Sequence, residues 1–103
     1  MSCDHWQVIR RPEYIEDLNA IEQWIAQDNP LAGIDMWLHI DEQVEQLADC
    51  NFPRRPSQRV ANAFELVAHK NYIVYFDQHE PTCTVTVRTV VHVARVFPPL
   101  ISS

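Results

Sequence analysis

Two residues near the end of the sequence could bind a partner or take part in acid–base chemistry. Arg88 and His92 lie four positions apart, so the two-residue period of a β-strand would place both side chains on one face. An arginine can pair with a carboxylate or a phosphate, and a histidine can exchange a proton near neutral pH. The alternative is that His92 satisfies local backbone groups and that Arg88 is a solvated edge charge.

A second candidate contact surface follows these two residues. Arg95 is succeeded by Phe97 and Pro98, so a cation stands beside an apolar segment. Apolar groups next to an arginine are typical of the energetically important residues of protein interfaces. This segment would therefore contact a protein target, unless it packs across the molecule's own sheet.

A basic cluster lies in the middle of the chain, at Arg54, Arg55 and Arg59. Such a cluster could bind nucleic acid or an acidic partner, or it could be an ordinary solvated surface. The two prolines of segment 52–57 cannot continue a helix, so the pattern predicts a connecting loop there.

The charges of the chain are unevenly distributed. The formal net charge is -6, but residues 12–49 hold ten acids and no Lys or Arg, which gives that segment a charge of -10. Residues 50–103 hold six bases and three acids. The sequence therefore predicts one strongly acidic layer beside a mildly basic remainder, and an acidic layer suits a basic partner.

The three cysteines, Cys3, Cys50 and Cys83, are far apart and lack the C-x-x-C spacing of a zinc or redox motif. We expect three reduced thiols, no metal site and no cofactor. The first residues lack both the basic and the apolar region of a secretory signal, and no apolar run approaches the roughly 18 residues of a membrane helix. These features predict a soluble, cytoplasmic protein.

The periodicity of the first half predicts a short strand over residues 5–10 and two helices. Apolar residues recur at three- and four-residue steps from Pro12 to about 27 and again from Pro30 to about 49. Asn29 can cap the second helix, with Pro30 at its first position. The large aromatic side chains of Trp24 and Trp37 are expected to lock the two helices together.

The second half is rich in Val and Thr and predicts strands over residues 63–68, 72–76 and 82–95. The short turns between them permit only antiparallel neighbours. The expected fold class is α+β with the order β-α-α-β-β-β, in which a helical hairpin packs on a mostly antiparallel sheet. A length of 103 residues suits one domain over residues 1–103.

Short motifs recur in a fixed order along nearly the whole chain, namely Asn29-Pro30, Phe52-Pro53, Glu65-Leu66-Val67, Tyr72-Ile73-Val74-Tyr75 and Val91-His92-Val93-Ala94-Arg95-Val96-Phe97-Pro98. With these motifs in this order, the sequence resembles the ParE branch of the RelE/ParE toxin superfamily. The chain departs from that pattern at Phe64 and Phe76, where the family usually has arginines, and at Val93, where a Gly is common.

The resemblance implies the toxin of a type II toxin–antitoxin system. Such a protein would inhibit DNA gyrase by binding, with no catalytic residues, and would be neutralised by a cognate ParD-like antitoxin. The antitoxin would fold an amphipathic helix onto the toxin, and the acidic helical hairpin predicts that this segment is basic. No direct contact with nucleic acid is expected in this reading.

Two alternatives stay open at this point. The first is RelE-like cleavage of messenger RNA on the ribosome, which needs cations to hold the phosphate. The second is an inactive, toxin-derived binding module, which the missing arginines at positions 64 and 76 would permit. An RNA site would have to be built from Arg54, Arg55, Arg59, Arg88 and His92.

Overall fold

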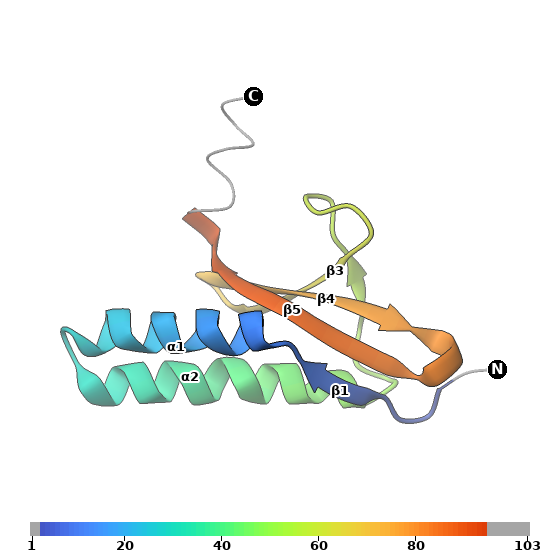
Figure 1. Ribbon diagram of the computed structural model, residues 1–103, viewed down its shortest axis with the longest axis horizontal. Helices are drawn as coiled ribbons and strands as arrows, with labels where there is room; N and C mark the ends of the chain where they lie inside the picture. The colour runs from blue at the N-terminus through green and yellow to red at the C-terminus, as the bar shows by residue number, and fades with distance from the viewer. Residues whose placement is uncertain (1–2, 95–103) are drawn as a thin grey trace.

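The computed structural model describes residues 3–94, and it places a helical hairpin against one face of a five-stranded sheet (Figure 1). The predicted fold class and order are confirmed, with one added short strand. The elements are β1 (Gln7–Arg10), α1 (Pro12–Ala26), α2 (Pro30–Glu45), the 3-10 turn η1 (Gln46–Ala48), β2 (Arg55–Pro56), β3 (Phe64–His69), β4 (Tyr72–His79), the 3-10 turn η2 (Glu80–Thr82) and β5 (Thr84–His92).

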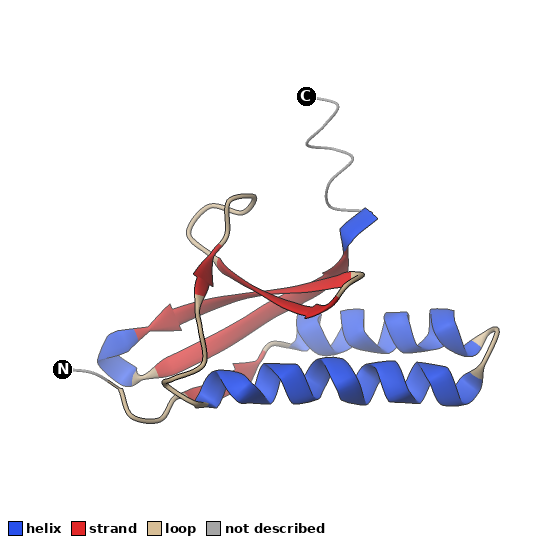
Figure 2. Ribbon diagram, turned by 180° about the vertical axis from the view of Figure 1, so that it is seen from behind, coloured by secondary structure: helices blue, strands red, loops and turns tan. Residues whose placement is uncertain are grey.

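Both helices begin at a proline, as the sequence predicted, because a proline at the first position loses no helical hydrogen bond. The side chain of Asn29 accepts a hydrogen bond from the backbone N–H of Ala32 at 3.2 Å, which confirms the predicted cap. Figure 2 shows the two helices lying antiparallel beneath the sheet. Within the part of the chain that the structure describes, no helix is long and apolar enough to span a membrane.

The sheet has the strand order β1-β5-β4-β3-β2. β3, β4 and β5 are antiparallel neighbours, as the short turns predicted, whereas β1 runs parallel to β5 at the edge. The segment predicted as a plain loop contains β2, in which Arg55 pairs with Glu65 and Pro56 with Phe64. Two residues of pairing are too few for sequence periodicity to reveal.

A β-bulge interrupts the last strand. Tyr75 pairs with Thr89 and the next residue, Phe76, pairs with Val87, so Arg88 is the extra residue between them. Beyond this bulge, the alternation of the β5 side chains between the two faces of the sheet shifts by one position. His92 pairs with Tyr72 and therefore points to the same face as that core residue, whereas Arg88 points to the opposite face. The prediction that Arg88 and His92 share a face was wrong, because a bulge cannot be seen in a simple two-residue period.

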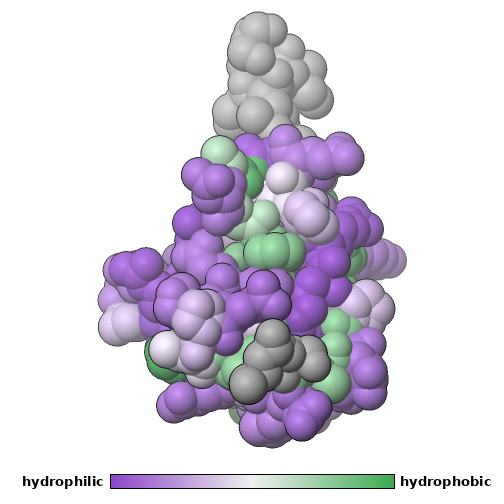
Figure 3. Space-filling view, turned by 90° about the vertical axis from the view of Figure 1, so that its right-hand side faces the viewer, coloured by the Kyte–Doolittle hydropathy of each residue, from purple (hydrophilic) through white to green (hydrophobic). Residues whose placement is uncertain are grey.

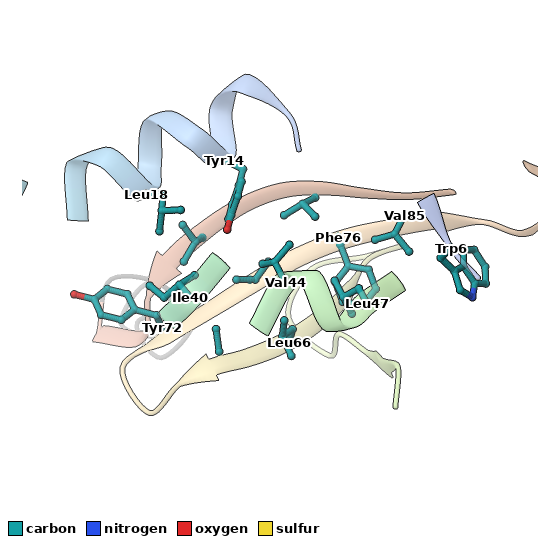
Figure 4. Packing of buried hydrophobic residues seen from close by; sticks show 14 of the residues in the cluster. Trp6, Tyr14, Leu18, Ile40, Val44, Leu47, Leu66, Tyr72, Phe76 and Val85 are labelled. Carbon is teal, nitrogen blue, oxygen red and sulfur yellow. The ribbon is translucent and has the colours of Figure 1, made fainter. Parts of the chain in front are cut away.

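The core lies between the hairpin and the sheet (Figure 4). α1 contributes Tyr14 and Leu18, and α2 contributes Ile40 and Val44, all with no exposed surface. Burying side chains of this size stabilises the fold by about 1.5–3 kcal/mol each. The sheet supplies the other half of the cluster, namely Leu66, Ala68, Tyr72, Val74, Phe76, Val85, Val87 and Val90.

A polar node ties β1 to both helices. The Arg10 guanidinium donates to the carboxylates of Asp41 and Glu45, each at 2.8 Å, and the Tyr14 hydroxyl donates to Asp41 at 2.9 Å. Burial and the hydrogen bond to Asp41 raise the pKa of Tyr14, so that its hydroxyl stays a donor. Burial alone would lower the pKa of Arg10, but the two carboxylates outweigh it and raise that pKa. The node thereby fixes α2 beside β1.

The two helices approach closely at Gly33, where an added Cβ would lie 2.6 Å from the backbone oxygen of Glu22 and 3.3 Å from Ala26. This close contact leaves no room between the helices for large aromatic rings. Trp24 is 64% exposed, so its predicted place in the hairpin core was wrong. Trp37 is partly buried, and its indole N–H donates to the Asn19 side chain at 2.9 Å.

The prediction of three free thiols was also wrong. Cys3 and Cys83 form a disulfide with their Cα atoms 5.7 Å apart, and Cys50 is a free, exposed cysteine. The parallel pairing of β1 with the start of β5 brings residue 83 beside the segment that precedes β1. The pairing is therefore a consequence of tertiary structure and not of spacing.

We expect Gly33→Ala to lower the free energy of unfolding by about 1–3 kcal/mol, because the new methyl group would force the helices apart. The same change on an open helix would instead stabilise by up to about 1 kcal/mol. Urea unfolding measures the difference, with Gln23→Ala on the exposed side of α1 as a control that shifts by less than about 0.5 kcal/mol. A stabilised Gly33→Ala variant would contradict the close contact.

Candidate functional site

A cavity of about 630 Å³ opens between α1 and the second half of β5. Its volume is in the range of pockets that hold small ligands or several side chains of a partner. Its walls are mainly apolar, with one carboxylate and one imidazole. The lining residues are Asp17, Ala20, Ile21, Trp24, Tyr72, Thr89, Val90, Val91, His92 and Ala94.

A hydrogen bond joins the two walls of this pocket. The Thr89 hydroxyl donates to the Asp17 carboxylate, which links β5 to α1 across 72 residues of sequence. Asp17 places a negative charge in an otherwise apolar pocket, and a carboxylate has further acceptor positions. The pocket can therefore accept an apolar group together with a cation.

His92 lies at the edge of the pocket and packs edge-on against the Tyr72 ring, with 5.2 Å between the ring centroids. Its Nδ1 accepts a hydrogen bond from the backbone N–H of Ala94 at 3.1 Å. In the neutral imidazole the proton is then on Nε2, which can donate to a bound partner. Of the two predicted contact residues that lie within residues 3–94, His92 lines the pocket and Arg88 does not.

Arg88 lies on the other face of the sheet from His92. Its Nε donates to the Asp77 carboxylate at 2.8 Å, and both side chains are partly exposed. A partly exposed ion pair of this kind contributes about 0–1 kcal/mol to stability, so a partner could displace it at little cost. Arg88 is thus a surface cation separate from the pocket.

The predicted basic cluster is folded against the protein itself, starting with Arg54. Its guanidinium donates to the backbone oxygens of Phe52 at 3.0 Å and Asp49 at 3.1 Å, and it lies 5.2 Å from the Trp6 ring centroid. Burial lowers the pKa of Arg54, and the nearby Cys50 and Asp49 partly offset this effect. Arg54 therefore supports the loop that precedes β2.

Arg55 and Arg59 both reach the carboxylate of Glu65, at 3.1 and 3.7 Å. The Glu65 side chain is only 2% exposed. The opposite residue in the sheet is Tyr75, whose pKa is raised by burial and then by the Glu65 charge. The two arginines therefore offset a buried carboxylate and hold segment 57–63 in place.

Phe64 and Phe76 occupy the two positions where the ParE resemblance predicts arginines. They are cross-strand partners, and their rings stack with centroids 5.6 Å apart. Phe76 has no exposed surface, so a charged side chain there would have to be buried. This chain has an aromatic pair packed in the core at these positions in place of cations.

Three of the predicted contact residues, Arg95, Phe97 and Pro98, lie outside the described residues. Sequence reasoning missed Asp17, Thr89 and Trp24 as pocket residues, because each fits a helix or strand pattern without distinction. Across residues 3–94, no group of three or more His, Cys, Asp or Glu side chains is arranged to hold a metal ion.

We expect Glu65→Gln to loosen the basic segment, because it removes the charge that holds Arg55 and Arg59. Amide hydrogen exchange of residues 57–63 should become faster, starting with the Ser57 N–H that donates to Ala63 at 2.8 Å. Asp77→Asn is the matched control, since it removes a carboxylate that pairs with an arginine elsewhere on the sheet, without touching this loop. Unchanged exchange in Glu65→Gln would show that the ion pairs do not order the segment.

Comparison with solved structures relates this arrangement to known proteins. The chain resembles a structure of the chromosomal ParDE toxin–antitoxin system from P. aeruginosa with a TM-score of 0.72 and 17% identity, over 87% of this chain and 98% of that one. It resembles a structure of the RelBE2 toxin–antitoxin complex from Mycobacterium tuberculosis with a TM-score of 0.53 and 16% identity, over 85% and 91%. At these identities the likeness shows a shared fold.

Comparison with a family model assigns the chain to a specific family. Residues 8–97 match the model described as the ParE toxin of the type II toxin–antitoxin system parDE, whereas no curated protein sequence matches the chain. The matched segment runs from the second residue of β1 to beyond β5 and includes every pocket residue named above. The chain therefore belongs to the ParE toxin family of type II toxin–antitoxin systems.

Proposed function

We propose that this ParE-family toxin acts by binding protein partners: it inhibits DNA gyrase and is neutralised when a cognate antitoxin occupies the pocket between α1 and β5. No chemical step is required of it. The observation that carries the proposal is the contrast between an open apolar pocket and a set of arginines that are already paired within the molecule. The proposal includes a cytoplasmic location, where a toxin that binds gyrase would have to act.

The pairing of the arginines disfavours RNA cleavage. A ribonuclease site needs cations that can meet a phosphate and its developing charge. Every arginine of residues 3–94 instead contacts a carboxylate or a backbone oxygen of this chain, and these residues are Arg10, Arg11, Arg54, Arg55, Arg59 and Arg88.

The acidic helical hairpin supports a basic antitoxin segment. α1 and α2 lie within the stretch of ten acids without a Lys or Arg, and Asp17 carries that charge into the pocket. α2 also carries exposed apolar residues, namely Leu31, Ile34 and Leu38, which an amphipathic helix could cover. The related solved structures are themselves from toxin–antitoxin systems, which fits an antitoxin partner.

We expect Trp24→Ala to weaken antitoxin binding at least tenfold, because an exposed tryptophan at a pocket is a typical anchor of an interface. The partner for this test is the product of the adjacent open reading frame, measured by calorimetry. Val67→Ala, an exposed apolar residue of β3 that does not line the pocket, is the matched control and should bind as the parent does. Equal affinity of both variants would exclude the pocket as the antitoxin site.

Target choice is tested by running the purified toxin in a gyrase supercoiling assay beside a ribosome-dependent messenger RNA cleavage assay. We expect inhibition of supercoiling and no cleavage. We further propose that Arg88, His92, Arg95, Phe97 and Pro98 contact the target, so Arg95→Ala and truncation after Val96 should weaken inhibition about tenfold or more.

Arg11→Ala is the control for the loss of a surface cation, since Arg11 lies at the start of α1 and pairs with Glu13. Cleavage of messenger RNA without gyrase inhibition would establish the RelE-like activity in place of our proposal. Inactivity in both assays, together with harmless expression, would indicate a toxin-derived module that acts only through its partner.

A further inference from the structure

The Cys3–Cys83 disulfide connects the start of the described chain to the turn between β4 and β5. It bridges 80 residues, from the segment before β1 to the residue between η2 and β5. Figure 3 looks onto this end of the molecule, where the surface is mainly hydrophilic with smaller hydrophobic areas between. The cavity lies between α1 and the second half of β5, so the disulfide is no part of it.

The two linked segments are also held together without the covalent bond. The backbone N–H of Gln7 donates to the Cys83 oxygen at 2.8 Å, and β1 pairs in register with residues 84–87. On the other side, the N–H of Trp6 donates to Ala48 at 2.9 Å. Arg10 adds its ion pairs to α2. The register of β1 is therefore specified by hydrogen bonds and packing, and the disulfide is added to them.

We propose that the Cys3–Cys83 disulfide is a redox-responsive clamp on the edge strand β1. In the oxidised state it fixes the N-terminal segment to the β4–β5 hairpin. In the reduced state the fold is retained through the contacts above, but β1 opens more readily. This inference concerns the stability of the toxin, and it rests on the proposed function only for the cytoplasmic location of the protein.

The location of the bond supports a reversible role. Cys83 is partly buried and follows the exposed residues of η2, so a small dithiol can approach its sulfur, whereas Cys3 is 8% exposed and belongs to the core cluster. Disulfides are rare in the cytosol, and those found there are usually transient, catalytic or redox-sensing. A disulfide that can be reduced while the protein stays folded fits a redox-sensing role.

The reducing step is an ordinary thiol–disulfide exchange. A thiolate of a dithiol reductant attacks the Cys83 sulfur, and the Cys3 sulfur leaves as a thiolate. The second thiol of the reductant then attacks its own sulfur in the mixed disulfide and releases the Cys83 thiolate. The reductant supplies two electrons and becomes a cyclic disulfide, and both cysteine thiolates take up protons from water.

The test compares the oxidised full-length chain with the same chain in dithiothreitol, by thermal unfolding and amide hydrogen exchange. We expect reduction to lower Tm by roughly 10–25 °C, since the bond closes a long loop in a small protein. Amides of β1 should exchange faster, while those of α2 keep their protection. Removing the reductant in the presence of oxidised glutathione should restore the original Tm.

Two variants sharpen the test. Cys83→Ser should show the Tm of the reduced parent and no response to dithiothreitol, whereas Cys50→Ser, which removes the free exposed cysteine, should respond as the parent does. The proposal is overturned by equal Tm values in both redox states, by an unfolded reduced parent, or by peptide mapping that finds Cys3 and Cys83 unlinked. If Cys83→Ser does not fold, the comparison of the oxidised parent with the reduced parent tests the proposal.

Discussion

Burial of one sheet face beneath the helical hairpin is the constraint on which the other features of this molecule depend. β4 alternates between the side chains of this face, Tyr72, Val74 and Phe76, and those of the opposite face. The helices cover that face with a stripe of apolar side chains, and Arg10, Asp41 and Tyr14 form the polar node beside this stripe. Because an isolated helical hairpin or a narrow sheet would be marginal in water, each layer is stable mainly through the other.

The same packing creates the pocket. The bulge at Arg88 lets the buried alternation of β5 change, so that Val87 and Val90 both meet the core although they are three positions apart. Strand β5 then presents Thr89 to Asp17 of α1, and the space beside this hydrogen bond stays open. Bulges are over-represented near functional sites because they redirect side chains without ending a strand. Here the bulge also separates Arg88 from His92.

Packing also determines which charged side chains are paired within the molecule. Two arginines of the basic cluster pair with Glu65, and the third donates hydrogen bonds to backbone oxygens. The positions where a ParE-like sequence usually has arginines carry the stacked pair Phe64 and Phe76. The basic cluster seen in the sequence therefore stabilises the fold of this chain. The helical layer beside the apolar pocket is acidic, and such a surface is suited to a protein partner of opposite charge.

Sequence by itself determined the two helices, the four longer strands and their order, and it missed only the two-residue strand β2 among the strands of the described chain. Prolines 12 and 30 and the cap at Asn29 specify where the helices begin, and the Val- and Thr-rich second half with short turns specifies antiparallel strands. These signals are local, so they can be read without knowing what each residue touches. The ParE resemblance was available for the same reason, since its motifs are short and ordered along the chain.

Only the tertiary structure decided which residues meet. The Cys3–Cys83 bond, the exposure of Trp24, the pairing of Arg55 and Arg59 with Glu65, and the two faces of Arg88 and His92 all depend on contacts between segments distant in sequence or on one bulge. Such contacts arise from strand register and from the close approach at Gly33, and no periodicity encodes them. The candidate site was therefore only partly predictable, because a pocket is a property of neighbouring elements and not of any one segment.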